Sequence, residues 1–173
     1  MRLNESIVIS APPKLIWDYV TDPGNALHYM SGVTRWEVCG EQRTGLGARY
    51  RMLIKVGSAE VGGLIEVVEF SPERDMAWSS VTGVDQRGRW RLRDAGNGRT
   101  RVELRFAYGV AGSGITGYIS ELVAAPTLSS HLRRTLQQLK RQVEHERLRR
   151  QAAQRRTARG VTSAGTSVSS SGS

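Results

Sequence analysis

Apolar and polar residues alternate along much of the first 110 residues. Between residues 101 and 110 nearly every second residue is apolar, and between residues 87 and 93 Gly88, Trp90 and Leu92 alternate with four arginines. Because successive side chains of a strand point to opposite faces, this pattern predicts strands with one apolar and one charged face. We interpret the arginine rows as a solvated face paired with acidic neighbours, in preference to a nucleic-acid surface.

Turn signals divide this region into strands of similar length. The breaks include Gly45-Leu46-Gly47, Ser71-Pro72-Glu73-Arg74 and Ala95-Gly96-Asn97-Gly98, which have the composition of turns. They leave six strands between residues 33 and 110, and residues 3–10 predict a seventh. Strands that follow one another without helical crossovers predict an antiparallel meander.

Two short helices are expected after the first strand. Pro12 and Pro13 suit the first turn of a helix that runs from residue 14 to residue 20. Thr21-Asp22-Pro23 then ends this helix and begins a second one at residues 25–30. Both helices are too short to form a core, so we expect them to close one end of the sheet.

A long helical pattern begins near Ser113. Its apolar residues recur at three- and four-residue steps as far as Val143, which predicts one face packed on the sheet. Pro126 predicts a kink after Ala124 and Ala125. The expected fold class is therefore α+β, with a seven-stranded antiparallel curved sheet wrapped around a long, kinked C-terminal helix.

The net charge of +9 is not spread evenly along the chain. Residues 1–130 contain fifteen Lys and Arg and fourteen Asp and Glu, whereas residues 131–159 contain ten Lys and Arg against two Glu. We expect a domain at residues 1–146 and a basic, then Ser/Gly-rich, disordered extension at residues 147–173. The N-terminus lacks the pattern of a secretory signal, no run of about 18 apolar residues occurs, and Cys39 is a single cysteine, so we expect a cytoplasmic protein.

Several blocks of sequence carry a family resemblance. They are IVISAPPKLIWDYVTDPGNALHYMSGVTRWEV, GLGARYRM, EVVEFSPERDMAWSS, RVELRFAYGV and a closing helix that ends HLRRTLQQLKRQVEHE. Together they cover residues 3–146 and resemble the START-like, or SRPBCC, superfamily, in its polyketide cyclase/dehydrase and lipid-transport branch. The resemblance implies a helix-grip (START/Bet v 1-like) fold with an internal hydrophobic cavity between the sheet and the last helix.

The residues expected to face this cavity are aromatic or aliphatic. The candidate ligand-binding residues are Tyr29, Trp36, Tyr50, Met52, Trp78, Trp90, Leu104, Phe106, Tyr108, Ile119, Leu122 and Val123. Rings and a methionine on one concave surface suit a flat or greasy ligand, through buried area and ring stacking. The alternative is that these side chains simply fill the core.

Catalysis would require a proton donor and acceptor inside the cavity. The candidates are His28, Glu66, Tyr108 and His131. Tyr108 has the inward parity of its strand. Apolar residues occupy both parities of the strand that carries Glu66, so its direction is undecided. Both histidines are compatible with a position on the solvent side. The sequence has no phosphate-binding loop, no metal-ligand spacing and no nucleophile elbow, so we expect no cofactor and no metal and lean against an enzyme.

The resemblance implies binding, or transport, of a small hydrophobic ligand such as a lipid, isoprenoid or polyketide. Two alternatives stay open: a polyketide cyclase or aromatase, and an interaction protein that acts through its Arg-rich C-terminal segment. The Arg133–Arg159 region suits an anionic membrane surface, nucleic acid is a less favoured partner, and a solvated tail without a partner is the simplest interpretation. The oligomeric state is left open.

Overall fold

The computed structural model describes residues 2–108 and 121–164 of the 173-residue chain, and the side chains of the last helix from residue 126 to residue 158. In chain order the elements are β1 (Arg2–Ile9), α1 (Pro13–Thr21), the 3-10 turn η1 (Pro23–Asn25), α2 (Ala26–Tyr29), β2 (Val33–Cys39), β3 (Arg49–Val56), β4 (Ala59–Ser71), β5 (Asp75–Ser80), β6 (Gln86–Asp94), β7 (Thr100–Tyr108) and α3 (Glu121–Ala164). This order of strand, short helices, six strands and long helix agrees with the prediction from sequence.

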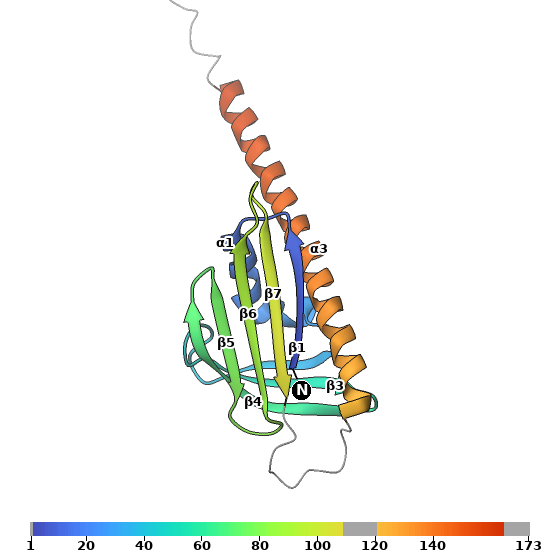
Figure 1. Ribbon diagram of the computed structural model, residues 1–173. Helices are drawn as coiled ribbons and strands as arrows, with labels where there is room; N and C mark the ends of the chain where they lie inside the picture. Colours follow the sequence, from blue (N-terminus) through green and yellow to red (C-terminus); the bar gives the residue numbers. More distant parts are fainter. Residues whose placement is uncertain (1, 109–120, 165–173) are drawn as a thin grey trace, which may run out of the picture.

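The seven strands form one antiparallel sheet in the order β1-β7-β6-β5-β4-β3-β2. The first and last strands of the sheet-forming region are neighbours, paired from Arg2 opposite Ala107 to Ile9 opposite Thr100. All other pairs join consecutive strands, as a meander requires. Figure 1 shows α3 crossing one face of the curved sheet, so the predicted helix-grip architecture is confirmed.

The two faces of the sheet differ as the alternation predicts. In β7, Val102, Leu104, Phe106 and Tyr108 are buried, and the residues between them are at least partly exposed. The same division runs along β6, where Trp90 and its alternate neighbours are buried. One face therefore belongs to the core, and we call it the inner face.

Several arginines of the outer face are paired with acidic residues. Arg89 lies 2.6 Å from Glu69 and 2.8 Å from Asp75, and Arg105 lies 2.8 Å from Glu103. Solvated pairs of this kind add little to stability. They agree with the interpretation of these arginine rows as a solvated face, cross-paired at Arg89, Arg91 and Arg105.

The two short helices begin at the prolines and the capping residue that predicted them. Pro13 occupies the first turn of α1, and the side chain of Asp22 accepts a 2.9 Å hydrogen bond from the Gly24 amide at the start of η1. The Tyr29 hydroxyl of α2 donates a 3.0 Å hydrogen bond to the carbonyl of Val20 in α1. This bond ties the two helices together beside the buried cluster.

The long helix α3 packs on the inner face and is fixed to β1. In the described part of the helix, its buried apolar residues are Leu128, Leu132, Leu136, Leu139 and Val143. Lys140 donates a 3.0 Å hydrogen bond to the carbonyl of Val8, and Glu144 accepts a 2.8 Å bond from the amide of Ser10. Pro126 lies inside α3, and the kink expected there stays a prediction.

The extension was expected to be disordered from residue 147, and for residues 147–164 the structure differs. There α3 continues as a helix to Ala164, past the end of the sheet in Figure 1. The physical reason is local, because Arg, Gln and Ala are good helix formers and Glu146 pairs with Arg150 one turn later at 2.8 Å. The domain boundary at residue 146 stays a prediction, and residues 165–173 lie outside the described part of the chain. Within that part, no helix combines the length and apolarity needed to cross a membrane.

Candidate ligand-binding site

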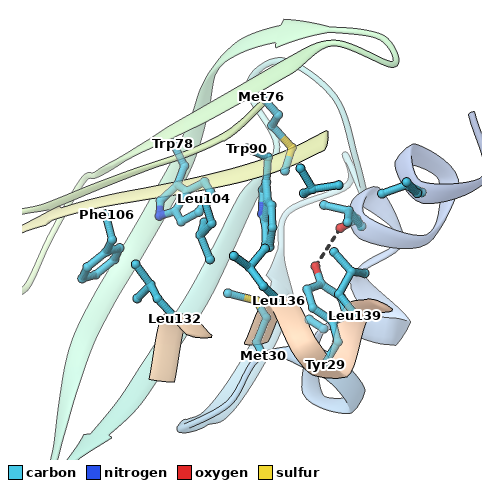
Figure 2. Close-up of a cluster of buried hydrophobic side chains, with 14 of the residues drawn as sticks. Tyr29, Met30, Met76, Trp78, Trp90, Leu104, Phe106, Leu132, Leu136 and Leu139 are labelled. Carbon is cyan, nitrogen blue, oxygen red and sulfur yellow. Dashed lines mark hydrogen bonds between the residues drawn. The ribbon is translucent and has the colours of Figure 1, made fainter. Parts of the chain in front are cut away.

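The inner face, α2 and α3 enclose one cluster of buried side chains, part of which Figure 2 shows. The cluster contains eight of the predicted ligand-binding residues: Tyr29, Tyr50, Met52, Trp78, Trp90, Leu104, Phe106 and Tyr108. Trp36 is half-buried and stacks on Tyr50, with ring centroids 5.0 Å apart. Ile119 lies outside the described residues, as do the side chains of Leu122 and Val123.

Between the sheet and α3, the described side chains pack closely together. Two small cavities of about 30 and 20 Å³ lie there, each with room for one or two water molecules. The first cavity is lined by Met30, Ser31, Val33, Met52, Ile54, Trp78, Leu104, Phe106, His131, Leu132 and Thr135. The second is lined by Ile54, Val56, Val61, Gly62, Val84, Gln86, Phe106, Tyr108 and Leu128. Ile54 and Phe106 line both, so the two cavities have a common wall.

Phe106 is the larger side chain of this common wall. In Figure 2 it projects from β7 toward Leu132 of α3, next to Trp78. A ligand pocket has a volume of about 300–1,000 Å³, far more than either cavity. A ligand of that size therefore fits neither cavity unless Phe106 or its neighbours move, and such a movement would join the two cavities.

Two buried hydrogen-bond donors lie on the walls of these cavities without a partner. Trp78 Nε1 and Gln86 Nε2 make no hydrogen bond within the described part of the chain, and each residue is only 3% exposed. Trp78 lines the first cavity and Gln86 lines the second. An unpaired buried donor costs about 1–3 kcal/mol, so a molecule that brought an acceptor atom to either group would recover that free energy.

His131 supplies a titratable group at the first cavity. Its Nδ1 lies 3.2 Å from the hydroxyl of Ser31, and the Ser31 amide donates a 2.9 Å hydrogen bond to Thr135 Oγ1. The ring also lies against Gly32, where any Cβ would come within 2.6 Å of it. Burial lowers the pKa of the His131 imidazole, while a backbone hydrogen bond to Lys55 opposes the shift. The neutral imidazole is thus favoured in the folded protein.

The family model described as polyketide cyclase / dehydrase and lipid transport matches residues 1–144. The chain belongs to this family. A comparison with curated proteins finds no match. The resemblance seen in the sequence is confirmed, and the match covers the whole of the sheet and the packed half of α3 as far as Glu144.

Solved structures share the fold of this polyketide cyclase / dehydrase and lipid transport family member. The protein TTHA0849 from Thermus thermophilus has 22% identity and a TM-score of 0.70, over 83% of this chain and 97% of that one. The Zhui aromatase/cyclase from Streptomyces sp. R1128 has 19% identity and a TM-score of 0.65, over 83% and 93%. The di-domain aromatase/cyclase StfQ of the steffimycin biosynthetic pathway has 16% identity and a TM-score of 0.61, over 86% of this chain and 47% of that one.

The four candidate catalytic residues of this family member do not form one group. His28 is exposed on α2, whereas Tyr108 is buried in the wall of the second cavity. Glu66 lies on the outer face, where its carboxylate is 2.6 Å from Arg49 Nε. The pattern of β4 left the direction of Glu66 undecided, and in the structure Val61, Ile65 and Val67 carry the inward parity. His131, which was compatible with the solvent side, instead lines the first cavity.

Sequence reasoning missed Gln86, Ser31 and Thr135. Gln86 has the inward parity of β6, two residues before Gly88, and extending the alternation by one step would have found it. Ser31 and Thr135 carry no such signal, because the contact between them depends on how α3 is oriented relative to the turn between α2 and β2. Among the described residues, no three His, Cys, Asp or Glu side chains gather as metal ligands.

Proposed function

We propose that this family member binds a small hydrophobic molecule that carries hydrogen-bond acceptors, in the space now divided into the two cavities. Such a molecule could be a lipid, an isoprenoid or a polyketide. The observation that carries the proposal is the pair of buried, unpartnered donors, Trp78 Nε1 and Gln86 Nε2, on the walls of two cavities that share Phe106. A plain hydrocarbon would leave both donors unpaired, whereas a carbonyl, ether or ester oxygen would satisfy them.

The surrounding side chains support the entry of such a ligand. Met30 and Met52 line the first cavity, and methionine is the side chain that adapts most readily to a changed packing partner. Movement of Phe106 joins the cavities and leaves Trp78 and Leu104 as ring and aliphatic surface for the ligand. Apolar area buried against such a surface contributes about 25 cal/mol for each Å².

The test begins with the protein purified from its own host. Native mass spectrometry followed by organic extraction is expected to reveal a bound apolar molecule that contains oxygen. Displacement of an apolar fluorescent probe then compares Phe106→Ala and Trp78→Phe with Arg87→Ala, a change at an exposed outer-face position. Tighter binding in Phe106→Ala, because the common wall is removed, together with weaker binding in Trp78→Phe, because a donor is lost, supports the inner site when Arg87→Ala binds normally. Unchanged binding in the first two variants, or an equal change in all three, contradicts it.

A second candidate function is polyketide cyclisation, and the His131–Ser31 pair favours it. A neutral imidazole on the cavity wall can take a proton from the carbon next to a carbonyl, and the carbanion can then attack a second carbonyl of the same chain to close a ring. Two of the solved structures similar in fold are described as aromatase/cyclases. Incubation with a reactive poly-β-ketone should give cyclised product with the native protein and much less with His131→Gln. Equal product with both proteins would leave binding as the function.

A further inference from the structure

The two sides of α3 have opposite characters. One side carries five buried apolar residues that pack on the sheet, from Leu128 to Val143. On the opposite side, Arg134, Arg141, Leu148 and Arg155 follow one another at seven-residue steps, and all four are exposed. Seven residues are nearly two turns of an α-helix, so these positions share one side.

Arg149 and Arg156 flank this line, and we call Arg134, Arg141, Arg149, Arg155 and Arg156 the arginine stripe. At a rise of 1.5 Å per residue the stripe is about 33 Å long. Its C-terminal part lies beyond the end of the sheet, on the orange-to-red portion of α3 in Figure 1. The stripe is therefore a straight, accessible row of guanidinium groups directed away from the ligand site.

Unlike Arg133 and Arg150 of the same helix, the stripe arginines have no acidic partner in the described part of the chain. Arg133 and Arg150 of the same helix pair with Glu5 and Glu146, at 3.7 and 2.8 Å, and Arg147 donates to the carbonyl of Ser10. Within the described part of the chain, no stripe side chain makes an ion pair or a hydrogen bond, and the sequence contains no Asp or Glu after residue 146. Its charge is thus available to an external anionic partner.

We propose that the arginine stripe docks the protein on the surface of an anionic phospholipid bilayer. A flat surface contacts a straight, one-sided row along its whole length, whereas the phosphates of a nucleic-acid duplex wind away from a straight helix. Leu148, which is 65% exposed, lies in the middle of the row and supplies an apolar side chain for the interface between headgroups and acyl chains. Guanidinium groups also bind phosphate oxygens with two parallel hydrogen bonds.

The proposal concerns a surface that is separate from the ligand site and does not depend on its occupant. Each basic residue near an anionic bilayer strengthens binding about fivefold. Removal of three stripe charges should therefore weaken binding by about 100-fold at low salt, and high salt should weaken the native protein in the same direction.

The test measures co-sedimentation of the full-length protein with vesicles of phosphatidylcholine alone or mixed with phosphatidylserine. The variant Arg141→Gln/Arg149→Gln/Arg156→Gln removes three stripe charges. A matched control removes three charges from exposed arginines of the sheet, Arg51→Gln/Arg87→Gln/Arg101→Gln. Leu148→Gln removes the apolar side chain without changing the charge. Circular dichroism melting curves establish that each variant remains folded.

The expected result is binding to the anionic vesicles alone, lost in the stripe triple variant, reduced in Leu148→Gln and largely kept in the control. Absence of a preference for anionic vesicles would overturn the proposal. An equal loss of vesicle binding in the control triple variant would also overturn the proposal, because binding would then depend on the net charge of the protein and not on the stripe. A parallel titration measures the affinity for duplex DNA and duplex RNA at the same salt concentration. Tighter binding to either duplex than to the anionic vesicles would assign the stripe to nucleic acid and overturn the proposal.

Discussion

Trp78 and Gly88 lie opposite each other on β5 and β6, and the indole occupies the space that a side chain at position 88 would need. A Cβ built on Gly88 would lie 1.8 Å from Cζ2 of Trp78. The glycine therefore lets the largest side chain of the first cavity lie flat against the inner face. It fixes the position of one of the two unpartnered donors of the ligand site.

Gly88→Ala should destabilise the fold through this contact. Overpacking of a well-filled core costs about 1–3 kcal/mol, and each kcal/mol lowers Tm by about 2–4 °C in a chain of this length. Thermal unfolding followed by circular dichroism measures the loss. In a Trp78→Phe background, which removes part of the ring, the same change should cost less. If the stability losses of the two substitutions simply add in the double mutant, the new methyl group does not clash with the indole.

His131 should make the stability of the protein depend on pH. Burial lowers its pKa in the folded state, so below the ordinary histidine pKa of about 6.5 the unfolded chain binds more protons than the folded one. The free energy of unfolding should then rise with pH through this window and be fully present above it. Urea unfolding from pH 5 to pH 8 measures the slope, which should shrink in His131→Gln. His28→Gln, at an exposed position, should keep the native slope, and a loss in both variants would contradict the assignment.

The alternation of β6 and β7 was sufficient to predict which of their residues face the core, because nearly every position between the inward residues is charged. In β4 the pattern failed, since apolar residues occupy both parities. The structure resolves this with a register shift between Val67 and Glu69, after which Phe70 packs on the core while Val68 is exposed. Such a bulge depends on pairing with β3 and β5, which the sequence of β4 alone does not contain.

In the ligand site too, features set by the local sequence were predictable, and features set by contacts between distant segments were not. The aromatic residues of the inner face were predictable from parity, whereas the volume left between them was not, because it depends on how closely α3 packs. The direction of His131 was left open by the sequence for a related reason. Its direction follows from the contact with Gly32, a residue about 100 positions away in the chain. The helical extension was missed because an apolar stripe was taken as the requirement for a helix, although local propensity and the Glu146–Arg150 pair suffice.

Gln86→Leu should change stability and ligand affinity in opposite directions. Replacing an unpartnered buried amide by an apolar side chain of similar size removes the desolvation penalty of Nε2, so the ligand-free protein should keep or gain stability. The affinity for an acceptor-bearing ligand should fall by up to about tenfold, the value of one neutral hydrogen bond of about 0.5–1.5 kcal/mol. Thermal unfolding and isothermal titration with the extracted ligand measure the two effects. A variant that loses stability and binds normally would show that Gln86 has a structural partner.

Removal of residues 148–173 should separate the domain from its docking helix. The last buried residue of α3 in the described part of the chain is Val143, and Arg147 with its bond to Ser10 is retained. The melting temperature should therefore change by no more than the effect of a surface substitution, within about 0.5 kcal/mol. Probe binding at the ligand site should be kept, while binding to anionic vesicles should weaken because Arg149, Arg155 and Arg156 are lost. A large fall in Tm would mean that the extension packs on the domain, and unchanged vesicle binding would confine any docking surface to residues before 148.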